Sequence, residues 1–345
     1  MKRLVYLDWL RFLAIIAVVT IHTAASMVAV NMNEVPLSNW LAANFYEAIS
    51  RPSVPLFVMI SGALLLSAKR ELTLFEFLKK RTGKIFIPLV AWSLIFYIYK
   101  VYSGSFETFN PKQFIYLFLT QGISIPYWFM YMILGLYLTA PIIKIFVNHA
   151  KRRDIEYFLL LWLYASIVVK FMNFYLGFSL NLELYVVTNY IGYFVLGYYL
   201  TTFEIKKPLR TLIYLAGLAG YAATFFFTWY STAQADGALQ EFWYEYHSPN
   251  VMMSAVATFL FLKYLISKET ERMPRGLNGI NEASFGIYLT HILVMTILSN
   301  EIFTPVEESL HPMVSIPVNV TLTMLISTVI VMVIRKIPIM KNLIP

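Results

Sequence analysis

About ten hydrophobic segments follow one another along this chain of 345 residues, each long enough to cross a hydrocarbon layer of ~30 Å as a helix. Hydrophobic residues make up 59% of the chain and charged residues only 13%, which is more apolar surface than a soluble domain can bury. The sequence therefore predicts an all-α polytopic membrane protein with about ten transmembrane helices. No Pro/Gly/Ser-rich linker divides it, so we expect a single transmembrane domain over residues 1–345. We place the spans at 4–30, 44–67, 84–103, 126–147, 155–173, 184–202, 208–230, 249–267, 283–303 and 312–335.

The connections between these spans fall alternately on two sides, and the basic residues gather on the side that also holds both termini. This distribution predicts cytoplasmic termini and a multi-pass protein of the inner (cytoplasmic) membrane. Topology thus accounts for the net charge of +8, and we expect contact with the lipid bilayer and no nucleic-acid partner. The basic side holds Lys2, Arg3, Lys69, Arg70, Lys79, Lys80, Arg81, Lys84, Lys144, Lys151, Arg152, Arg153, Lys206, Lys207, Arg210, Lys263, Lys268, Arg272, Arg275, Arg335, Lys336 and Lys341. The other side holds Lys112 with Glu34, Glu107, Glu183, Asp236, Glu241, Glu245, Glu301, Glu307 and Glu308.

The residue types present narrow the available chemistry. The chain contains no cysteine, which excludes disulfides, thiol nucleophiles and thiolate metal sites. It also has no Gly-rich phosphate loop, no paired-histidine metal motif and no G-x-S-x-G nucleophile elbow. We therefore expect neither a metal site nor a permanently bound cofactor, and any covalent chemistry must use His, Ser, Thr, Tyr or carboxylate side chains.

Three ionisable residues, Asp8, Arg11 and His22, interrupt the first apolar segment. At about 100° per residue, the steps from Arg11 to His22 return to within roughly 20° of the same direction, and Asp8 falls within about 60° of both. The three side chains therefore share one face of a helix. Ionisable groups are expensive to bury in a bilayer and by default indicate function. We accordingly assign His22, Arg11 and Asp8 to a catalytic site.

Arg51 lies at a comparable depth on the second segment, and Glu47 precedes it by one helical turn, where the two side chains can pair. Arginine cannot lose its proton to escape desolvation, so Arg11 and Arg51 need an anionic partner or a wet cavity. We add Arg51 to the catalytic candidates as an oxyanion stabiliser and Glu47 as a group that tunes His22. The alternative is a set of structural ion pairs, Asp8 with Arg11 and Glu47 with Arg51, and a histidine that only bridges helices.

Further candidates lie near the ends of other segments. Arg81 and Lys84 begin the third segment, where the positive-inside rule alone explains them, although grouped cations also suit a phosphate-rich ligand. His291 lies inside the ninth segment, where a packing role and a site role are both open. The connection 231–248 is rich in aromatic and acidic residues, which suits an interfacial belt, the interpretation we favour, and also a sugar-binding rim. The connection 104–125 contains an apolar stretch too short to span, which we expect to lie in the interface or to re-enter the membrane.

These residues resemble the acyltransferase family 3 of integral-membrane enzymes, and within it the branch that acylates surface polysaccharides such as enterobacterial common antigen. The similarity covers nearly the whole chain. It is carried by Asp8-x-x-Arg11-x10-His22, Ser50-Arg-Pro-Ser-Val-Pro-Leu-Phe-Val-Met-Ile-Ser-Gly62, Arg81-x-x-Lys84, Trp128-Phe-x-Tyr131, Gly135-Leu-Tyr-Leu-x-x-Pro141 and Ser284-Phe-Gly-Ile-Tyr-Leu-x-His291.

The resemblance implies roles for individual residues. His22 is then the catalytic histidine, and Arg11 belongs to the path of the acyl donor. Arg81 and Lys84 hold acyl-CoA on the cytoplasmic side, and we assign Ser61 and His291 to the same donor site. The family commonly has arginine at the position of Lys84, so this chain keeps the charge there but lacks the bidentate fork.

The expected function is O-acyl transfer, in which an acyl group, most simply acetyl, moves from cytosolic acetyl-CoA to a hydroxyl of a surface or lipid-linked glycan. Neutral His22 acts as general base, with a covalent acyl-histidine as the alternative route. One rival function is a transporter or flippase for lipid-linked saccharides, which would not consume acyl-CoA. Another is a regulatory membrane subunit that keeps the fold without the activity. The expected partners are therefore the bilayer, acyl-CoA and a glycan acceptor, and a homo-oligomer is compatible with the sequence.

Overall fold

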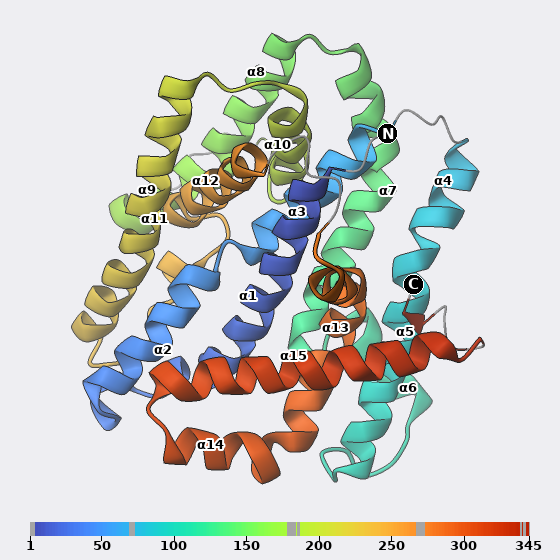
Figure 1. Ribbon diagram of the computed structural model, residues 1–345, viewed down its shortest axis with the longest axis vertical. Coiled ribbons are helices and arrows are strands. Elements are labelled where there is room, and N and C mark those ends of the chain that lie inside the picture. The colour runs from blue at the N-terminus through green and yellow to red at the C-terminus, as the bar shows by residue number, and fades with distance from the viewer. Residues whose placement is uncertain are drawn as a thin grey trace.

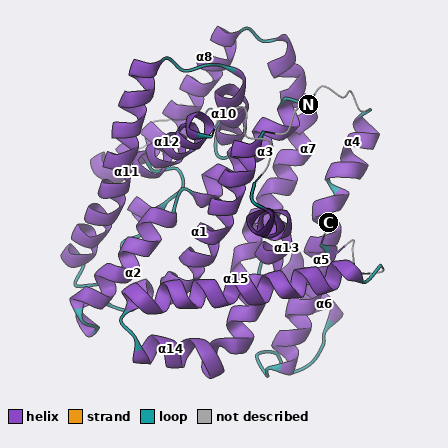
Figure 2. Cartoon of the chain, viewed as in Figure 1, coloured by secondary structure: helices purple, strands orange, loops and turns teal. Residues whose placement is uncertain are grey.

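A computed structural model describes residues 4–68, 73–177, 184, 187–266, 273–338, 340, 343 and 344 (Figure 1). Over these residues the chain is helical and contains no β-strand (Figure 2). The helices are α1 (Val5–Ala29), α2 (Leu37–Ser50), α3 (Ser53–Leu66), α4 (Leu74–Arg81), α5 (Gly83–Tyr102), α6 (Pro111–Leu119), α7 (Trp128–His149), α8 (Arg152–Leu163), α9 (Val169–Leu176), α10 (Ile191–Thr202), α11 (Lys207–Gln234), α12 (Pro249–Leu265), α13 (Arg275–Leu298), α14 (Thr304–Ser309) and α15 (Pro312–Lys336). Short helical turns are η1 (Met32–Glu34), η2 (Ile125–Tyr127), η3 (Tyr164–Val168), η5 (Phe242–Tyr244) and η6 (Ser299–Phe303). Of the charged residues that indicated topology, Lys2, Arg3, Lys69, Arg70, Glu183, Lys268, Arg272 and Lys341 lie outside the described residues.

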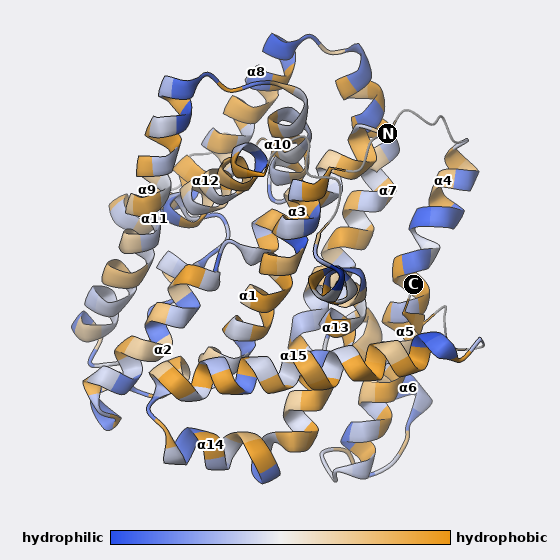
Figure 3. Ribbon diagram, in the orientation of Figure 1, coloured by the Kyte–Doolittle hydropathy of each residue, from blue (hydrophilic) through white to orange (hydrophobic). Residues whose placement is uncertain are grey.

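Eight helical stretches of the described chain are long and apolar enough to cross a membrane. Their surfaces carry large exposed apolar side chains, for example Leu138 and Ile142 on α7 and Leu325 and Val329 on α15, as contact with lipid requires. Hydrophobic residues colour long stretches of α7 and α15 in Figure 3. The prediction of an all-α, multi-pass membrane protein is thus confirmed. The two further predicted spans coincide with α10 and α12, which have 12 and 17 residues, so the count of about ten stays a prediction.

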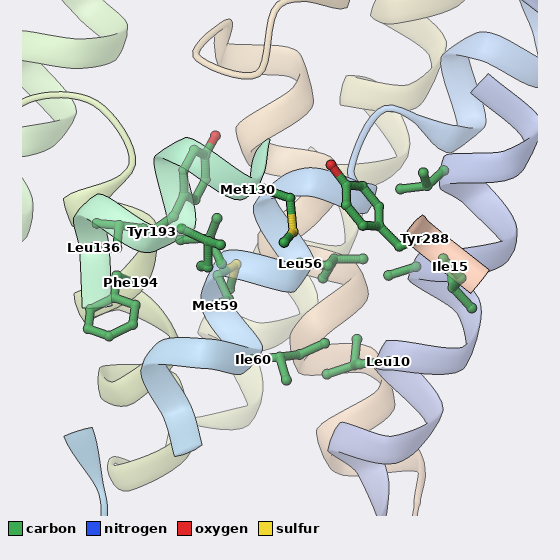
Figure 4. Close-up of a cluster of buried hydrophobic side chains, with 14 of the residues drawn as sticks. Leu10, Ile15, Leu56, Met59, Ile60, Met130, Leu136, Tyr193, Phe194 and Tyr288 are labelled. Atoms are coloured by element: carbon green, nitrogen blue, oxygen red, sulfur yellow. The ribbon is translucent and has the colours of Figure 1, made fainter. Parts of the chain in front are cut away.

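The centre of the bundle is formed by α1 and α3. α1 packs against α2, α3, α13 and α15, and α3 packs against α10 and α7. In Figure 1, α15 crosses the bundle at a steep angle to α1. Figure 4 shows the core between them, where Leu10 and Ile15 of α1 face Leu56 and Ile60 of α3, with Tyr288 of α13 nearby.

Two glycines bring α3 and α10 into unusually close contact. A Cβ atom added to Gly197 would lie 1.9 Å from the carbonyl oxygen of Met59, and one added to Gly62 would lie 1.8 Å from that of Phe194. Small residues permit this backbone approach between membrane helices, where van der Waals packing drives association. The contact fixes the position of α3, which lines the cavities described below.

The predicted span 44–67 is divided in the structure. α2 ends at Ser50 and α3 begins at Ser53, with Arg51 and Pro52 between them. Proline lacks a backbone N–H and disrupts a helix that it enters, which accounts for the break. The break brings Arg51 to the end of a helix rather than to its middle.

The two long connections, 104–125 and 231–248, differ in how they fold. The apolar stretch of 104–125 forms α6, a helix of nine residues, so the expectation that it is too short to span is confirmed. The interpretation of 231–248 as an interfacial belt stays a prediction, and the structure shows that the segment around Tyr244 and Tyr246 folds onto the bundle. Tyr244 Oη donates to Asn44 Oδ1 at 2.5 Å, and the Tyr246 carbonyl accepts from a tyrosine hydroxyl of α10 at 2.6 Å.

Candidate active site

The ionisable residues of α1 face α3, α7 and α13. Arg11 and His22 line two neighbouring cavities that share three aromatic residues, one from each of these helices. The prediction that the two side chains share a face is therefore confirmed. Asp8 is buried beside them and accepts hydrogen bonds from Arg11 Nη1 at 3.5 Å and from Asn281 Nδ2 of α13 at 3.3 Å. The expected Asp8–Arg11 pair thus forms, and this contact helps to hold the Arg11 side chain in place.

The cavity at Arg11 is basic and has a volume of about 280 Å³. Its lining combines Arg11 with Arg81 at the end of α4, Lys84 at the start of α5 and Ser61 of α3. Ser61 hydrogen-bonds Tyr137 of α7, which also lines the cavity. Four of the five residues that the sequence assigned to the acyl donor therefore meet in one cavity.

A second cavity, of about 320 Å³, continues from the first and shares Arg81 and Lys84 with it. It adds two further cations, Lys80 and Lys144. Within the described part of the chain, no acidic side chain lines either cavity. Five cations line the two cavities, and Arg11 among them pairs with Asp8, a carboxylate that does not line either cavity. This excess of positive charge favours a ligand that carries several negative charges, such as a chain of phosphates.

His22 lines a much smaller cavity of about 30 Å³, which has room for about one or two water molecules. Its side chain is partly buried and is surrounded mainly by aromatic rings. The rings shared with the basic cavity are Phe57, Phe129 and Tyr288, and their centroids are 6.1 Å apart for Phe57–Phe129 and 5.5 Å apart for Phe129–Tyr288. These three rings separate His22 from the basic cavity.

His291 lies beside His22 and is fully buried on α13, with a distance of 5.2 Å between the ring centroids. His291 Nδ1 contacts the carbonyl oxygens of Ile287 at 3.1 Å and Tyr288 at 2.7 Å, so it carries the proton of the neutral ring. Its Nε2 has no hydrogen-bond partner among the described residues. His291 therefore accompanies the catalytic candidate and does not line the basic cavity to which the sequence assigned it.

A fourth cavity, of about 440 Å³, adjoins the His22 cavity. Trp128 and Tyr246 line both this outer cavity and the His22 cavity, and their rings are stacked at 5.8 Å with an interplanar angle of 28°. The rest of its lining includes Arg51 and most of the segment 241–247. The aromatic and acidic connection thus forms the wall of a cavity.

Arg51 belongs to the outer cavity and pairs with Glu47, at 3.0 Å between Nη2 and Oε2. The side chain of Glu47 is 2% exposed and that of Arg51 16% exposed, so the pair is removed from bulk solvent. The Arg51 guanidinium also lies 4.2 Å from the centre of the Tyr244 ring. Arg51 and His291 are electrostatic neighbours of His22. Glu47 is connected to His22 through its ion pair with Arg51.

The cavities form a continuous series from one end of the site to the other. The two basic cavities share Arg81 and Lys84, the inner basic cavity shares three aromatic rings with the His22 cavity, and the His22 cavity shares Trp128 and Tyr246 with the outer one. His22 therefore lies between a strongly cationic compartment and a mixed-charge aromatic compartment. Aromatic side chains line the boundary between the His22 cavity and its neighbour on each side.

The structure also adds residues that the sequence did not single out as candidates. Tyr137 and Tyr288 line the basic cavity, and Tyr246 and His247 line the outer one. Tyr288 Oη donates to the carbonyl oxygen of Pro126, which fixes its ring beside His22. Tyr137 and Tyr288 stand in motifs that carry the family resemblance, and Tyr246 and His247 stand in the aromatic connection 231–248. Aromatic residues are abundant throughout this chain, so these patterns did not separate the four residues from their neighbours.

Comparison with known proteins supports an enzymatic interpretation of this site. A family model described as an acyltransferase domain matches residues 4–335, a range that contains every residue of the site. No curated protein and no solved structure matches the chain. Because the family model covers nearly the whole chain, the protein belongs to the acyltransferase family 3 of membrane acyltransferases.

Proposed function

We propose that this protein transfers an acyl group, most simply acetyl, from cytosolic acyl-CoA to a hydroxyl of a surface or lipid-linked glycan. The family supplies the acyltransferase activity. The donor, the acceptor and the surface-polysaccharide branch are part of the proposal. The proposal is carried by the position of His22 between a strongly cationic compartment and an aromatic compartment of mixed charge.

The basic cavities suit acyl-CoA because the coenzyme carries phosphates at one end and an acyl thioester at the other. In this proposal Arg81 and Lys84 bind the phosphates, with Lys80 and Lys144 at the mouth. Arg11 lies further inside the same cavity, held by Asp8, towards the aromatic rings that precede His22. The thioester is then directed towards the histidine.

In the proposed reaction, His22 removes the proton of the acceptor hydroxyl as the oxygen attacks the thioester carbonyl. The tetrahedral intermediate collapses and its C–S bond breaks. The departing CoA thiolate takes the proton from the imidazolium, so the products are a glycan ester and free CoA. Arg51 is the cation nearest to this step on the acceptor side and stabilises the developing oxyanion.

The small volume around His22 requires movement during the reaction. A cavity of about 30 Å³ cannot hold an acyl group together with a sugar hydroxyl. The rings of Phe57, Phe129 and Tyr288 must therefore shift on the donor side, and those of Trp128 and Tyr246 on the acceptor side. Such a closed resting state keeps water from the thioester and suppresses hydrolysis.

The test is release of CoA from acetyl-CoA by the purified protein in lipid nanodiscs, with a crude lipid-linked glycan fraction as acceptor. We expect glycan-dependent release that is lost in His22→Ala and retained in His149→Ala, whose histidine lies exposed at the end of α7. Normal melting of His22→Ala excludes a folding defect. If wild-type protein releases no CoA with any acyl-CoA tested and, when reconstituted in sealed vesicles, instead moves a lipid-linked saccharide across the bilayer, the enzyme proposal is wrong and transport replaces it.

A further inference from the structure

Among the described residues, one buried acceptor nitrogen in the lining of the outer cavity has no hydrogen-bond partner. His247 is 6% exposed and lines this cavity, and its Nε2 has no hydrogen-bond partner among the described residues. Its ring hydrogen-bonds the backbone of Asn189. The Asn189 N–H already donates to Ser166 Oγ at 2.9 Å, so the group left for His247 is the carbonyl oxygen. His247 Nδ1 therefore carries the ring proton, and Nε2 presents a lone pair.

This histidine is neutral under physiological conditions. Burial, followed by the nearby charge of Lys170, lowers the pKa of His247 to about 4. A buried acceptor left without a donor costs free energy, and such costs persist in proteins mainly where a ligand or water satisfies the group. A hydroxyl group is the natural complement of a neutral imidazole acceptor.

The aromatic rings of the outer cavity provide a second, independent indication. The Trp128 ring is stacked on Tyr246, with an interplanar angle of 28°, and is tilted by 37° relative to Tyr190, with 5.8 Å between centroids in both pairs. Tyr190 in turn contacts the His247 ring at 4.6 Å. All four side chains line the cavity. Their faces offer apolar surface next to hydrogen-bonding groups, a combination that matches the C–H face and hydroxyl edge of a sugar ring.

The charges of the outer cavity distinguish it from the donor side. Arg51 and Lys170 contribute two cations, and Glu241 and Glu245 two carboxylates. Lys170 lies 3.8 Å from Glu245. The opposing charges cancel to a first approximation, so the cavity has no preference for an anion, in contrast to the five cations of the basic cavities.

We propose that the outer cavity is the acceptor site and binds an uncharged pyranose ring, which stacks on Trp128 and donates a hydroxyl hydrogen bond to His247 Nε2. This inference rests on the proposed acyl transfer for its role but not for its binding chemistry. In this proposal His247 is a specificity-determining residue. The sugar ring lies next to Tyr246, which also lines the His22 cavity. A sugar bound there has its hydroxyls on the acceptor side of the catalytic histidine.

Saturation-transfer difference NMR tests the site without requiring turnover. Protein in nanodiscs is titrated with the methyl glycosides of glucose, galactose and N-acetylglucosamine, and with glucuronate as the anionic counterpart. We expect saturation at the ring C–H protons of at least one neutral glycoside and weaker binding of glucuronate. His247→Leu removes the acceptor and should weaken neutral-sugar binding roughly 3- to 10-fold, while His247→Gln, which retains an acceptor, should bind within about 3-fold of wild type.

Two further variants make the result specific. Trp128→Ala should weaken binding by a similar factor and reduce saturation of the ring protons, and His149→Leu, at the exposed end of α7, should change nothing. Absence of saturation with every neutral glycoside, equal affinity in His247→Leu and wild type, or preference for glucuronate would overturn the inference. Failure of the proposed function gives a different pattern, in which the sugar binds as expected but wild-type protein releases no CoA.

Discussion

The buried Glu47–Arg51 pair provides a quantitative test of how this membrane protein holds a charge. Glu47→Gln removes one charge with little change of shape and leaves the Arg51 guanidinium, whose side chain is 16% exposed, without its carboxylate partner at 3.0 Å. Breaking a buried pair by removing one partner typically costs about 3–5 kcal/mol. We expect about 3 kcal/mol, the lower end, because Arg51 borders a large polar cavity and retains the Tyr244 ring at 4.2 Å.

The free energy of unfolding is measured by SDS titration in mixed micelles, followed by tryptophan fluorescence. The matched control is the Arg152–Glu156 pair, which has the same helical spacing and a distance of 2.8 Å but side chains that are 49% and 39% exposed. Glu156→Gln should produce a much smaller loss because solvent screens exposed pairs. A double variant, Glu47→Gln with Arg51→Met, should regain most of the stability lost in the single variant. Equal losses for Glu47→Gln and Glu156→Gln, or a double variant less stable than the single one, would refute the argument from burial.

Three further outcomes are expected. Gly197→Ala places a Cβ atom 1.9 Å from a backbone oxygen of α3 and should lower the melting temperature strongly. Gly135→Ala, whose Cβ meets nothing within 4 Å, should leave the melting temperature equal or slightly higher. Equal effects of the two substitutions would contradict the close contact between α3 and α10. Arg81→Ala and Lys84→Ala should each raise the KM for acetyl-CoA several-fold in the CoA-release assay, with little change in the KM for the acceptor. Lys84→Arg should retain or improve donor binding. A change confined to the KM for the acceptor would argue against a donor site. The pKa of His247 is lowered from 6.5 to about 4 in the folded protein, so the unfolded state binds more protons between these two pH values. The free energy of unfolding should therefore fall as the pH drops from about 6.5 towards 4. This pH dependence should be weaker in His247→Gln, and an unchanged dependence would exclude His247 as its source.

Much of the fold could be predicted because it depends on local chain properties. The lengths of apolar segments predict where helices cross the membrane, and eight of the predicted spans coincide with helical stretches of sufficient length and hydropathy. The 3.6-residue period also predicts that Arg11 and His22 share a face, and the spacing of Glu47 and Arg51 predicts their ion pair. The break at Pro52 was the main local feature that the predicted span 44–67 missed, because hydropathy averaged over the whole stretch stays high in spite of Arg51 and Pro52.

The donor side of the site was also accessible from the sequence, since its residues stand out as charges in or beside apolar segments. Arg81 and Lys84 do line the cavity that contains Arg11 and Ser61. The sequence placed His291 with them, but the packing of α13 against α1 brings its ring to His22 instead. A helical period specifies the face on which a side chain lies. It does not specify which helix covers that face.

The sequence by itself therefore determined the class of fold, the shared face of Arg11 and His22 on the first helix and the ion pairs within single helices. Only the tertiary structure decided that the segment around Tyr246 and His247 lines the outer cavity, and that aromatic rings from three helices lie between His22 and the basic cavity. The physical reason is the range of the interactions. Hydropathy and helical period act over one or two turns, whereas a cavity is formed by side chains from distant segments, whose positions depend on helix crossing and on close contacts such as that of Gly197 with α3.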